Sequence, residues 1–194
     1  MPDGPTRERT LMKLKAIPLA TALLPAVALH VCYLLAAGQG HVSWCFPYFP
    51  DCVSISATVR HSPESVVFRA ALIPTAVLMM IYWRLNSEWL KELGTHTIRL
   101  NRAMVWRGMT AALGLFLYSS LLSEAGDLYR QLRLIGTILF YVFTYLAQLS
   151  LTVQIRSVVR APGAAVSVSA YRSLAAVCGA VAILGTASLL SWAF

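Results

Sequence analysis

Hydrophobic residues along this chain fall into long runs that are separated by short polar breaks and one long polar segment. Each run is close to the length of about 20 apolar residues that an α-helix needs to cross a hydrocarbon core. The pattern therefore predicts an all-α fold, a polytopic bundle of transmembrane helices that forms a single transmembrane domain over residues 1–194. The five predicted spans are residues 16–37, 65–83, 103–123, 132–153 and 170–192.

The first run follows a basic N-terminal segment, an arrangement that signal peptides also have. The apolar region of a signal peptide is only about 7–15 residues long, whereas this run extends from Ala16 to Ala37. Pro18 and Pro25 interrupt the run, and transmembrane helices tolerate proline better than soluble helices do. We interpret the run as an uncleaved first span.

Composition agrees with a membrane protein, because only 12% of the residues are charged and 58% are hydrophobic. An average soluble domain carries about twice that share of charged residues. The net charge of +8 comes from basic residues in short pieces between the apolar runs, which suits a membrane surface better than a nucleic-acid groove. We expect membrane lipids as partners, other membrane proteins as an alternative, and no nucleic acid.

Charge also predicts the orientation of the spans. With a cytoplasmic N-terminus, most of the 16 Lys and Arg residues fall on the cytoplasmic side. The other side receives only Arg60, Arg69, Arg130 and Arg133. The positive-inside bias therefore places loop 38–64 on the non-cytoplasmic side. The expected location is the bacterial inner membrane, or the plasma membrane or secretory pathway of a eukaryote.

The predicted non-cytoplasmic position of loop 38–64 favours a disulfide between the two cysteines that it contains. Cys45 and Cys52 enclose a short proline-containing stretch of the outer loop, where disulfides can form and persist. We predict a Cys45–Cys52 disulfide, with two reduced thiols as the alternative. Cys32 and Cys178 lie inside spans, where we expect them to pack as small apolar residues.

Polar residues able to act together collect on the non-cytoplasmic side. They have three interpretations: an ordinary solvated loop, a site for a lipid headgroup, or a carboxylate–histidine pair for acyl transfer or hydrolysis. They are His41, Asp51, Ser54, Ser56, His61 and Glu64 in the loop, with Glu124 and Asp127 after the third span.

The fourth span carries polar side chains at spacings of three and four, which place them on one helical face. This face consists of Thr137, Tyr141, Thr144, Tyr145, Gln148 and Thr152. It would either line a headgroup cavity or hold helices together. Tyr141 and Tyr145 are near enough to the outer side to join the candidate lipid site, whereas Gln148 is deeper and is better explained by contacts between helices. Two small-residue pairs in the fifth span, Ala175 with Gly179 and Ala182 with Thr186, are close-packing signals.

Familiar catalytic signatures are missing from the sequence, so enzymatic activity stays an open question. The histidines and acids of the loop follow no regular zinc spacing, and we expect neither a metal nor a cofactor. His30 stands in the middle of the first span. We expect it to form a hydrogen bond between helices rather than to carry protons.

The outer loop also carries a resemblance. A basic N-terminus, one span and a cysteine-bearing loop with Val53-Ser54-Ile55-Ser56 precede Pro63-Glu64-Ser65-Val66-Val67-Phe68-Arg69 at the start of the next span. This layout resembles the DRAM (damage-regulated autophagy modulator) and FGF-receptor-activating-protein family. Its most similar branch contains the post-GPI-attachment lipid-remodelling factor and the N-terminal domain of the fungal cell-wall-biogenesis protein. Leu100-Asn101-Arg102 and Ser123-Glu124 look similar as well.

The resemblance implies a polytopic protein connected with GPI-anchor remodelling, lipid organisation or autophagy control. The family has six spans, whereas this chain has five predicted spans, and its P-S-I-S element is present here only as Ser54-Ile55-Ser56. Our first hypothesis is a protein that binds or helps to remodel a lipid at the non-cytoplasmic leaflet. The alternatives are a non-enzymatic membrane scaffold or regulator and, third, a membrane acyltransferase or hydrolase.

Overall fold

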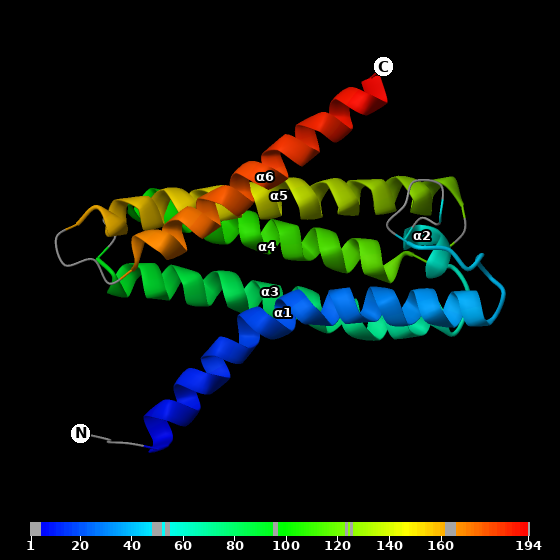
Figure 1. Ribbon diagram of the computed structural model, residues 1–194, viewed down its shortest axis with the longest axis horizontal. Coiled ribbons are helices and arrows are strands. Elements are labelled where there is room, and N and C mark those ends of the chain that lie inside the picture. Colours follow the sequence, from blue (N-terminus) through cyan, green and yellow to red (C-terminus); the bar gives the residue numbers. More distant parts are fainter. Residues whose placement is uncertain are drawn as a thin grey trace. The chain divides into compact units, whose positions relative to one another are not determined.

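The computed structural model describes residues 5–47, 52, 55–94, 97–122, 124, 126–161 and 166–193, and among these the side chains of residues 5–15, 55, 56 and 188–193 are not described. The described chain is helical and contains no strand, which confirms the predicted all-α class (Figure 1). The helices are α1 (Pro5–Gly38), α2 (Ile55–Thr58), α3 (Glu64–Glu92), α4 (Ile98–Ser120), α5 (Asp127–Val159) and α6 (Val168–Ala193).

Four of these helices contain stretches long and apolar enough to cross a membrane, so the protein is a multi-pass membrane protein. The stretches are Ala16–Gly38, Glu64–Glu92, Asp127–Val159 and Val168–Ala187. Helix α4, which covers the predicted third span as far as Ser120, is not among them. Pro18, Pro25 and Pro74 all lie inside helices, as expected where neighbouring helices can satisfy the freed backbone groups.

Two helices extend beyond their predicted spans. Helix α3 continues past Trp83 to Glu92, and Lys91 Nζ donates to Glu88 Oε1 at 2.8 Å in its last turns. Such a pair supports a helix at its exposed surface. Helix α5 continues past Val153 to Val159, so Gln154, which the sequence analysis leaves outside the span, belongs to the helix.

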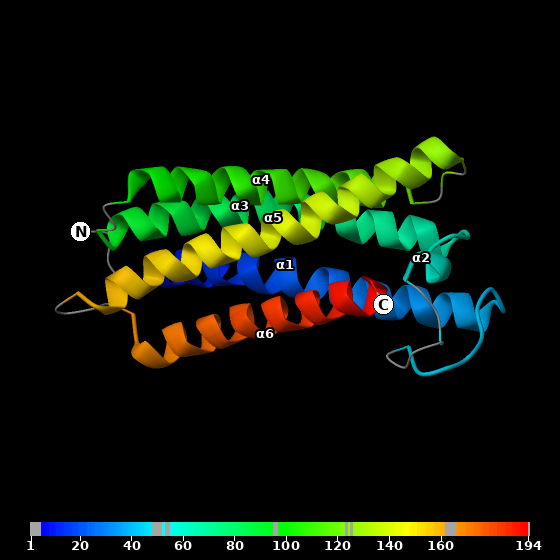
Figure 2. The ribbon, with the colours of Figure 1, turned by 90° about the horizontal axis from the view of Figure 1, so that it is seen from above.

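The chain divides into two compact units, and each is described by itself. Unit 1 comprises residues 1–82 and 109–141, and unit 2 comprises residues 83–108 and 142–194. Helices α3, α4 and α5 each contribute a part to both. In unit 1, the α1–α3 loop with α2 and the turn between α4 and α5 lie at the same end in both views (Figures 1 and 2).

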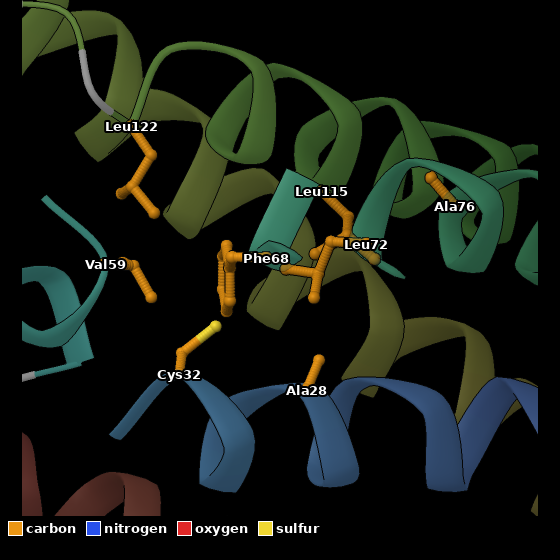
Figure 3. Close-up of a cluster of buried hydrophobic side chains, with 8 residues drawn as sticks. All are labelled: Ala28, Cys32, Val59, Phe68, Leu72, Ala76, Leu115 and Leu122. Atoms are coloured by element: carbon orange, nitrogen blue, oxygen red, sulfur yellow. The ribbon is translucent and has the colours of Figure 1, made fainter. Parts of the chain in front are cut away.

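Unit 1 has an apolar core built from α1, α3 and α4. Phe68 lies in its centre, and the sulfur of Cys32 points toward the Phe68 ring (Figure 3). Leu72 of α3 and Leu115 of α4 extend this core, and Val59 covers it from the loop. Because these side chains come from segments far apart in the sequence, their burial fixes where the loop starts and ends.

Glycines allow α4 and α5 to meet closely in unit 1. A Cβ atom added to Gly114 would lie 2.7 Å from the backbone nitrogen of Phe140 and 2.8 Å from the carbonyl oxygen of Gly136. A Cβ added to Gly136 would lie 2.9 Å from the carbonyl oxygen of Gly114. The two helices therefore touch backbone to backbone, a packing mode that small residues permit in membranes.

Unit 2 has a glycine contact of another kind. The indole ring of Trp83 is 1% exposed and lies against Gly108, where an added Cβ would meet the ring at 2.2 Å. Helix α6 is largely exposed, with Cys178 as a buried contact. The close-packing signal predicted at Gly179 is not used within the described residues, because nothing lies within 4 Å of a Cβ placed there.

Candidate functional site

The end of α1 positions the first residue of the site. Gly40 has a positive φ of 75°, a conformation that favours glycine. The amide of Gly40 donates to the carbonyl of Ala37 at 3.2 Å, and the amide of His41 donates to the carbonyl of Ala36 at 2.9 Å. This pair of bonds is a Schellman motif, which reverses the chain and turns His41 back toward the bundle.

His41 meets the carboxylate of Glu64. Its Nδ1 lies 2.8 Å from Glu64 Oε1, with the Glu64 side chain fully buried and the His41 side chain 29% exposed. The second carboxylate oxygen, Oε2, is also buried and has no hydrogen-bond partner in the described part of the chain. The ring of His61 lies against that of His41, with 4.6 Å between the centroids. The structure therefore brings together a buried acid and two histidines.

Glu64 has a fixed position at the N-terminal end of α3. It is the first residue of α3, where a negative charge is favoured by the helix dipole. The carbonyl of His61 accepts a bond from the Ser65 amide at 2.9 Å, which ties His61 to the same helix start. The thiol of Cys32 lies 3.4 Å from the Glu64 carbonyl oxygen, so Cys32 contributes more than the apolar packing expected of it.

The turn between α4 and α5 lies at this end as well. Arg69 Nη2 of α3 lies 3.8 Å from Glu124 Oε1, in an ion pair whose side chains are both partly exposed. Arg133 Nη1 donates to the carbonyls of Leu121 at 3.0 Å and Glu124 at 2.6 Å. A cation at the carbonyl end of α4 is favoured by the helix dipole, and here it also fixes the turn.

The predicted disulfide between Cys45 and Cys52 is confirmed, with 5.7 Å between the two Cα atoms. The loop is also tied to α1, because the amide of Cys45 donates to the hydroxyl of Tyr33 at 2.9 Å. That hydroxyl donates in turn to the carbonyl of Cys45. Tyr33 was not among the predicted site residues, and no local pattern marks it, because its partner is twelve positions away.

The remaining predicted site residues have different outcomes. Asp51 and Ser54 lie outside the described residues, and Ser56 is in α2 with an undescribed side chain. Asp127 begins α5 and is exposed. On α5, the side chain of Tyr141 in unit 1 is 62% exposed. Tyr145 belongs to unit 2 and is half-buried.

Polar contacts between helices occur in unit 2 at several described side chains. The guanidinium of Arg107 donates to the hydroxyl of Ser150, and Asn101 Nδ2 donates to the Ser87 carbonyl at 3.2 Å. Thr152 Oγ1 lies 3.3 Å from Cys178 Sγ. The hydrogen bond at Gln148 is made by its backbone carbonyl, which accepts from Thr152 at 2.8 Å.

The carboxylate and the imidazoles at the loop end of unit 1 can bind and orient a polar group. The chain that carries them also matches a known protein family. A family model described as the Frag1/DRAM/Sfk1/Cwh43P N-terminal domain matches residues 13–192. The chain belongs to this family. No curated protein matches it, and no solved structure does. The resemblance found in the sequence is therefore confirmed at the level of the family.

Membership of the Frag1/DRAM family and the apolar helices together identify a membrane protein that sits in lipid. Within the described residues, no group of three or more His, Cys, Asp or Glu side chains has a geometry that would hold a metal ion. The loop end of unit 1 presents the carboxylate, the imidazoles and the guanidinium described above.

Proposed function

We propose that this Frag1/DRAM family protein binds a membrane lipid, or helps to remodel one, at the non-cytoplasmic leaflet. The observation that carries the proposal is the pairing of Glu64 with His41, 2.8 Å apart at the start of a membrane-crossing helix. A fully buried carboxylate is costly unless it has a partner. The buried Glu64 carboxylate is therefore better explained by recognition of a ligand than by packing between helices.

The pair orients the histidine for a ligand. Because His41 Nδ1 faces the carboxylate, its Nε2 is the ring nitrogen left to meet a ligand, as in other carboxylate-supported histidines. His61 stacks on the same ring, and Arg60 and Arg69 lie nearby in the sequence. Imidazole and guanidinium groups suit a phosphate-bearing headgroup.

A specific orientation and span count belong to the same proposal. We propose that residues 1–194 form one transmembrane domain in which α4 supplies a fifth span and the N-terminus is cytoplasmic. Support comes from the length of α4, which covers Ile98–Ser120, and from the positive-inside distribution of Lys and Arg. Single cysteines at Arg60 and Lys91, both at exposed positions, are expected to react with membrane-impermeant reagents from opposite sides. Reaction of both from one side would refute the five-span map.

Lipid that co-purifies with the protein tests the binding proposal. We expect mass spectrometry to find a phosphate-bearing lipid on the wild type and roughly tenfold less on His41→Ala and Glu64→Gln, because a hydrogen bond to a charged group contributes about 1.5 kcal/mol or more. His30→Ala is the matched control, since His30 is exposed on α1 and its Nδ1 lies 2.7 Å from the Ala26 carbonyl of its own helix. Equal occupancy in all four proteins would contradict the lipid site and favour the scaffold or regulator.

The same geometry favours a second candidate, a hydrolase or acyltransferase. A carboxylate that orients a histidine is the arrangement of a general base and its orienting group. In that case Glu64→Gln would abolish turnover of a phospholipid ester while lipid still co-purified. Loss of lipid and turnover together would instead indicate binding as the primary role of the pair.

A further inference from the structure

Large aromatic side chains are exposed in the segment 42–47, where the disulfide begins. The side chain of Trp44 is 68% exposed and that of Phe46 is 61% exposed, on either side of Cys45. Two neighbouring exposed rings of this size are unusual on a surface that faces water. At a membrane surface the same exposure is favourable, since Trp has an apolar body and a polar N–H group that suit the headgroup layer.

The loop does not extend away from the membrane-crossing helix. The chain reverses at Gly40, and Cys45 returns to the hydroxyl of Tyr33 with bonds through both its amide and its carbonyl. Tyr33 lies five residues before the end of α1 at Gly38, which is about 7.5 Å along the axis at 1.5 Å per residue. Side chains on a helix tilt toward its N-terminus, so the hydroxyl lies no nearer to the helix end than Tyr33 itself.

Trp44 is therefore held beside the last turns of a membrane span. Its ring meets the Tyr33 ring edge-on, with 6.4 Å between centroids and an interplanar angle of 79°. On the same helix, Val31 and Leu34 are 39% and 55% exposed, within the apolar stretch Ala16–Gly38. Exposed aromatic side chains next to Cys45 and exposed apolar side chains of α1 therefore occur at the same end of this candidate span.

We propose that the segment 42–47, which the disulfide and Tyr33 hold at Cys45, is an interfacial anchor, with Trp44 and Phe46 inserted into the headgroup layer of the leaflet around this end of α1. The occupant of the exposed aromatic surface is lipid of the surrounding bilayer. The disulfide and the Tyr33 hydroxyl hold the loop at this depth, so the aromatic rings enter the interface without the loss of freedom that a flexible loop would suffer.

The anchor also sets the depth of the Glu64–His41 pair. Glu64 contacts Cys32 through its carbonyl, and Cys45 contacts Tyr33, the next residue of α1. If Trp44 marks the headgroup layer, the carboxylate–histidine pair lies in that layer too. This position of the pair refines the proposed lipid site and depends on that proposal. The anchor itself does not depend on it.

Fluorescence quenching in phosphatidylcholine vesicles tests the anchor. The signal of Trp44 is the difference between the wild type and Trp44→Phe, and Trp106→Phe, which removes an indole of 69% exposure from α4, controls the subtraction. We expect a nitroxide on the lipid headgroup to quench the Trp44 signal about twofold more than a bromine at the middle of the acyl chain, as befits an interfacial indole. Aqueous iodide should quench it weakly.

Strong quenching by iodide with no effect of the headgroup nitroxide would overturn the anchor, because the loop would then lie in water or under a soluble partner. Preferential quenching by the acyl-chain bromine would overturn the interfacial depth. Tyr33→Phe keeps the ring beside Trp44 but removes the hydroxyl that holds Cys45. It should raise iodide quenching at least about twofold if that bond sets the depth. The anchor and the lipid site fail separately, since His41→Ala should leave the Trp44 signal unchanged.

Discussion

Unit 1 and unit 2 both bury polar side chains, but they satisfy them differently. Two buried hydroxyls of unit 1 bond within their own helices: Thr75 donates to the Ala71 carbonyl at 2.8 Å and Ser119 to that of Phe116 at 3.1 Å. In unit 2, Ser150 accepts a bond from Arg107 of another helix. Polar contacts thus cross between helices inside unit 2, whereas in unit 1 they gather at the loop end around Glu64.

This difference separates two uses of polarity in a membrane protein. Polar contacts between helices add modest stability and fix helix positions, and in unit 2 the guanidinium of Arg107 makes such a contact with the Ser150 hydroxyl. An ionisable group without such a partner indicates function by default. In unit 1 one carboxylate oxygen of the buried Glu64 has no hydrogen bond in the described part of the chain, and two histidines lie beside this acid. We therefore expect substitutions in unit 2 to change stability alone, and substitutions at the loop end of unit 1 to change what the protein binds.

The largest expected effect on stability is at the backbone-to-backbone contact between α4 and α5 in unit 1. Gly114→Ala should lower the free energy of unfolding by about 3 kcal/mol, at the upper end for overpacking, because its neighbours are backbone atoms that cannot rotate away. Gly179→Ala is the control, since a Cβ there meets nothing within 4 Å. It should stabilise α6 by up to about 1 kcal/mol through helix propensity. Unfolding in detergent by heat or denaturant measures both effects. An unchanged free energy of unfolding in Gly114→Ala would contradict the close contact between α4 and α5.

The disulfide is the next largest effect. The double variant Cys45→Ser/Cys52→Ser should lose about 2–3 kcal/mol, because a short loop is no longer closed in the unfolded chain. A reductant should destabilise the wild type by a similar amount and leave the double variant unchanged, which makes it an internal control. Equal melting temperatures for oxidised wild type and double variant would show that the bridge does not stabilise unit 1.

Several features of this structure could be predicted from the sequence. The helices follow from the apolar runs, since hydrogen bonding in lipid leaves few alternatives to a helix. The disulfide follows from two cysteines a short distance apart in a loop that is predicted to be non-cytoplasmic, where bridges persist. The end of α1 was also open to prediction, because Gly38 and Gly40 are typical of a helix C-terminus, and His41, which directly follows, was already a candidate site residue.

Contacts between distant segments could not be predicted. Small residues at Gly114 and Gly179 permit a close approach equally well, yet only Gly114 receives a neighbouring backbone. The pairing of His41 with Glu64 depends on how α1 and α3 pack around Phe68, which no local pattern encodes. The contact between Arg107 and Ser150 of α5 was likewise not predicted, and the interhelical role expected of Gln148 stays a prediction.

A smaller effect should distinguish the contacts of unit 2. Ser150→Ala removes the hydroxyl that accepts from Arg107 and should cost about 1 kcal/mol, within the range for bonds between helices in membranes. Ser157→Ala is matched, because the exposed Ser157 hydroxyl donates to the Gln154 carbonyl of its own helix at 2.7 Å. Its effect on stability should stay within about 0.5 kcal/mol. Loss of bound lipid in Ser150→Ala would break the comparison, because it would give unit 2 a binding role.

The smallest expected effect decides how far the lipid site extends into unit 1. Gly136 lies against Tyr118 near the end of α4, and Tyr141 is five residues further along α5, about 7.5 Å at 1.5 Å per residue. The hydroxyl of Tyr141 is thus well inside a membrane span, on a side chain that is 62% exposed.

A hydroxyl at that position either meets a polar part of a bound lipid or has no useful partner in the acyl chains. If it meets the lipid, Tyr141→Phe should lower the co-purified lipid by about threefold, the equivalent of about 0.6 kcal/mol for an average hydrogen bond in a membrane. Stability should change by less than about 0.5 kcal/mol, since the side chain is exposed. Tyr145→Phe, one turn further along α5 and half-buried, should leave the lipid content unchanged. The alternative result is unchanged lipid in Tyr141→Phe together with loss of lipid in His41→Ala. It would confine the site to the cluster of Glu64, His41 and His61, and the Tyr141 hydroxyl would then face the surrounding bilayer.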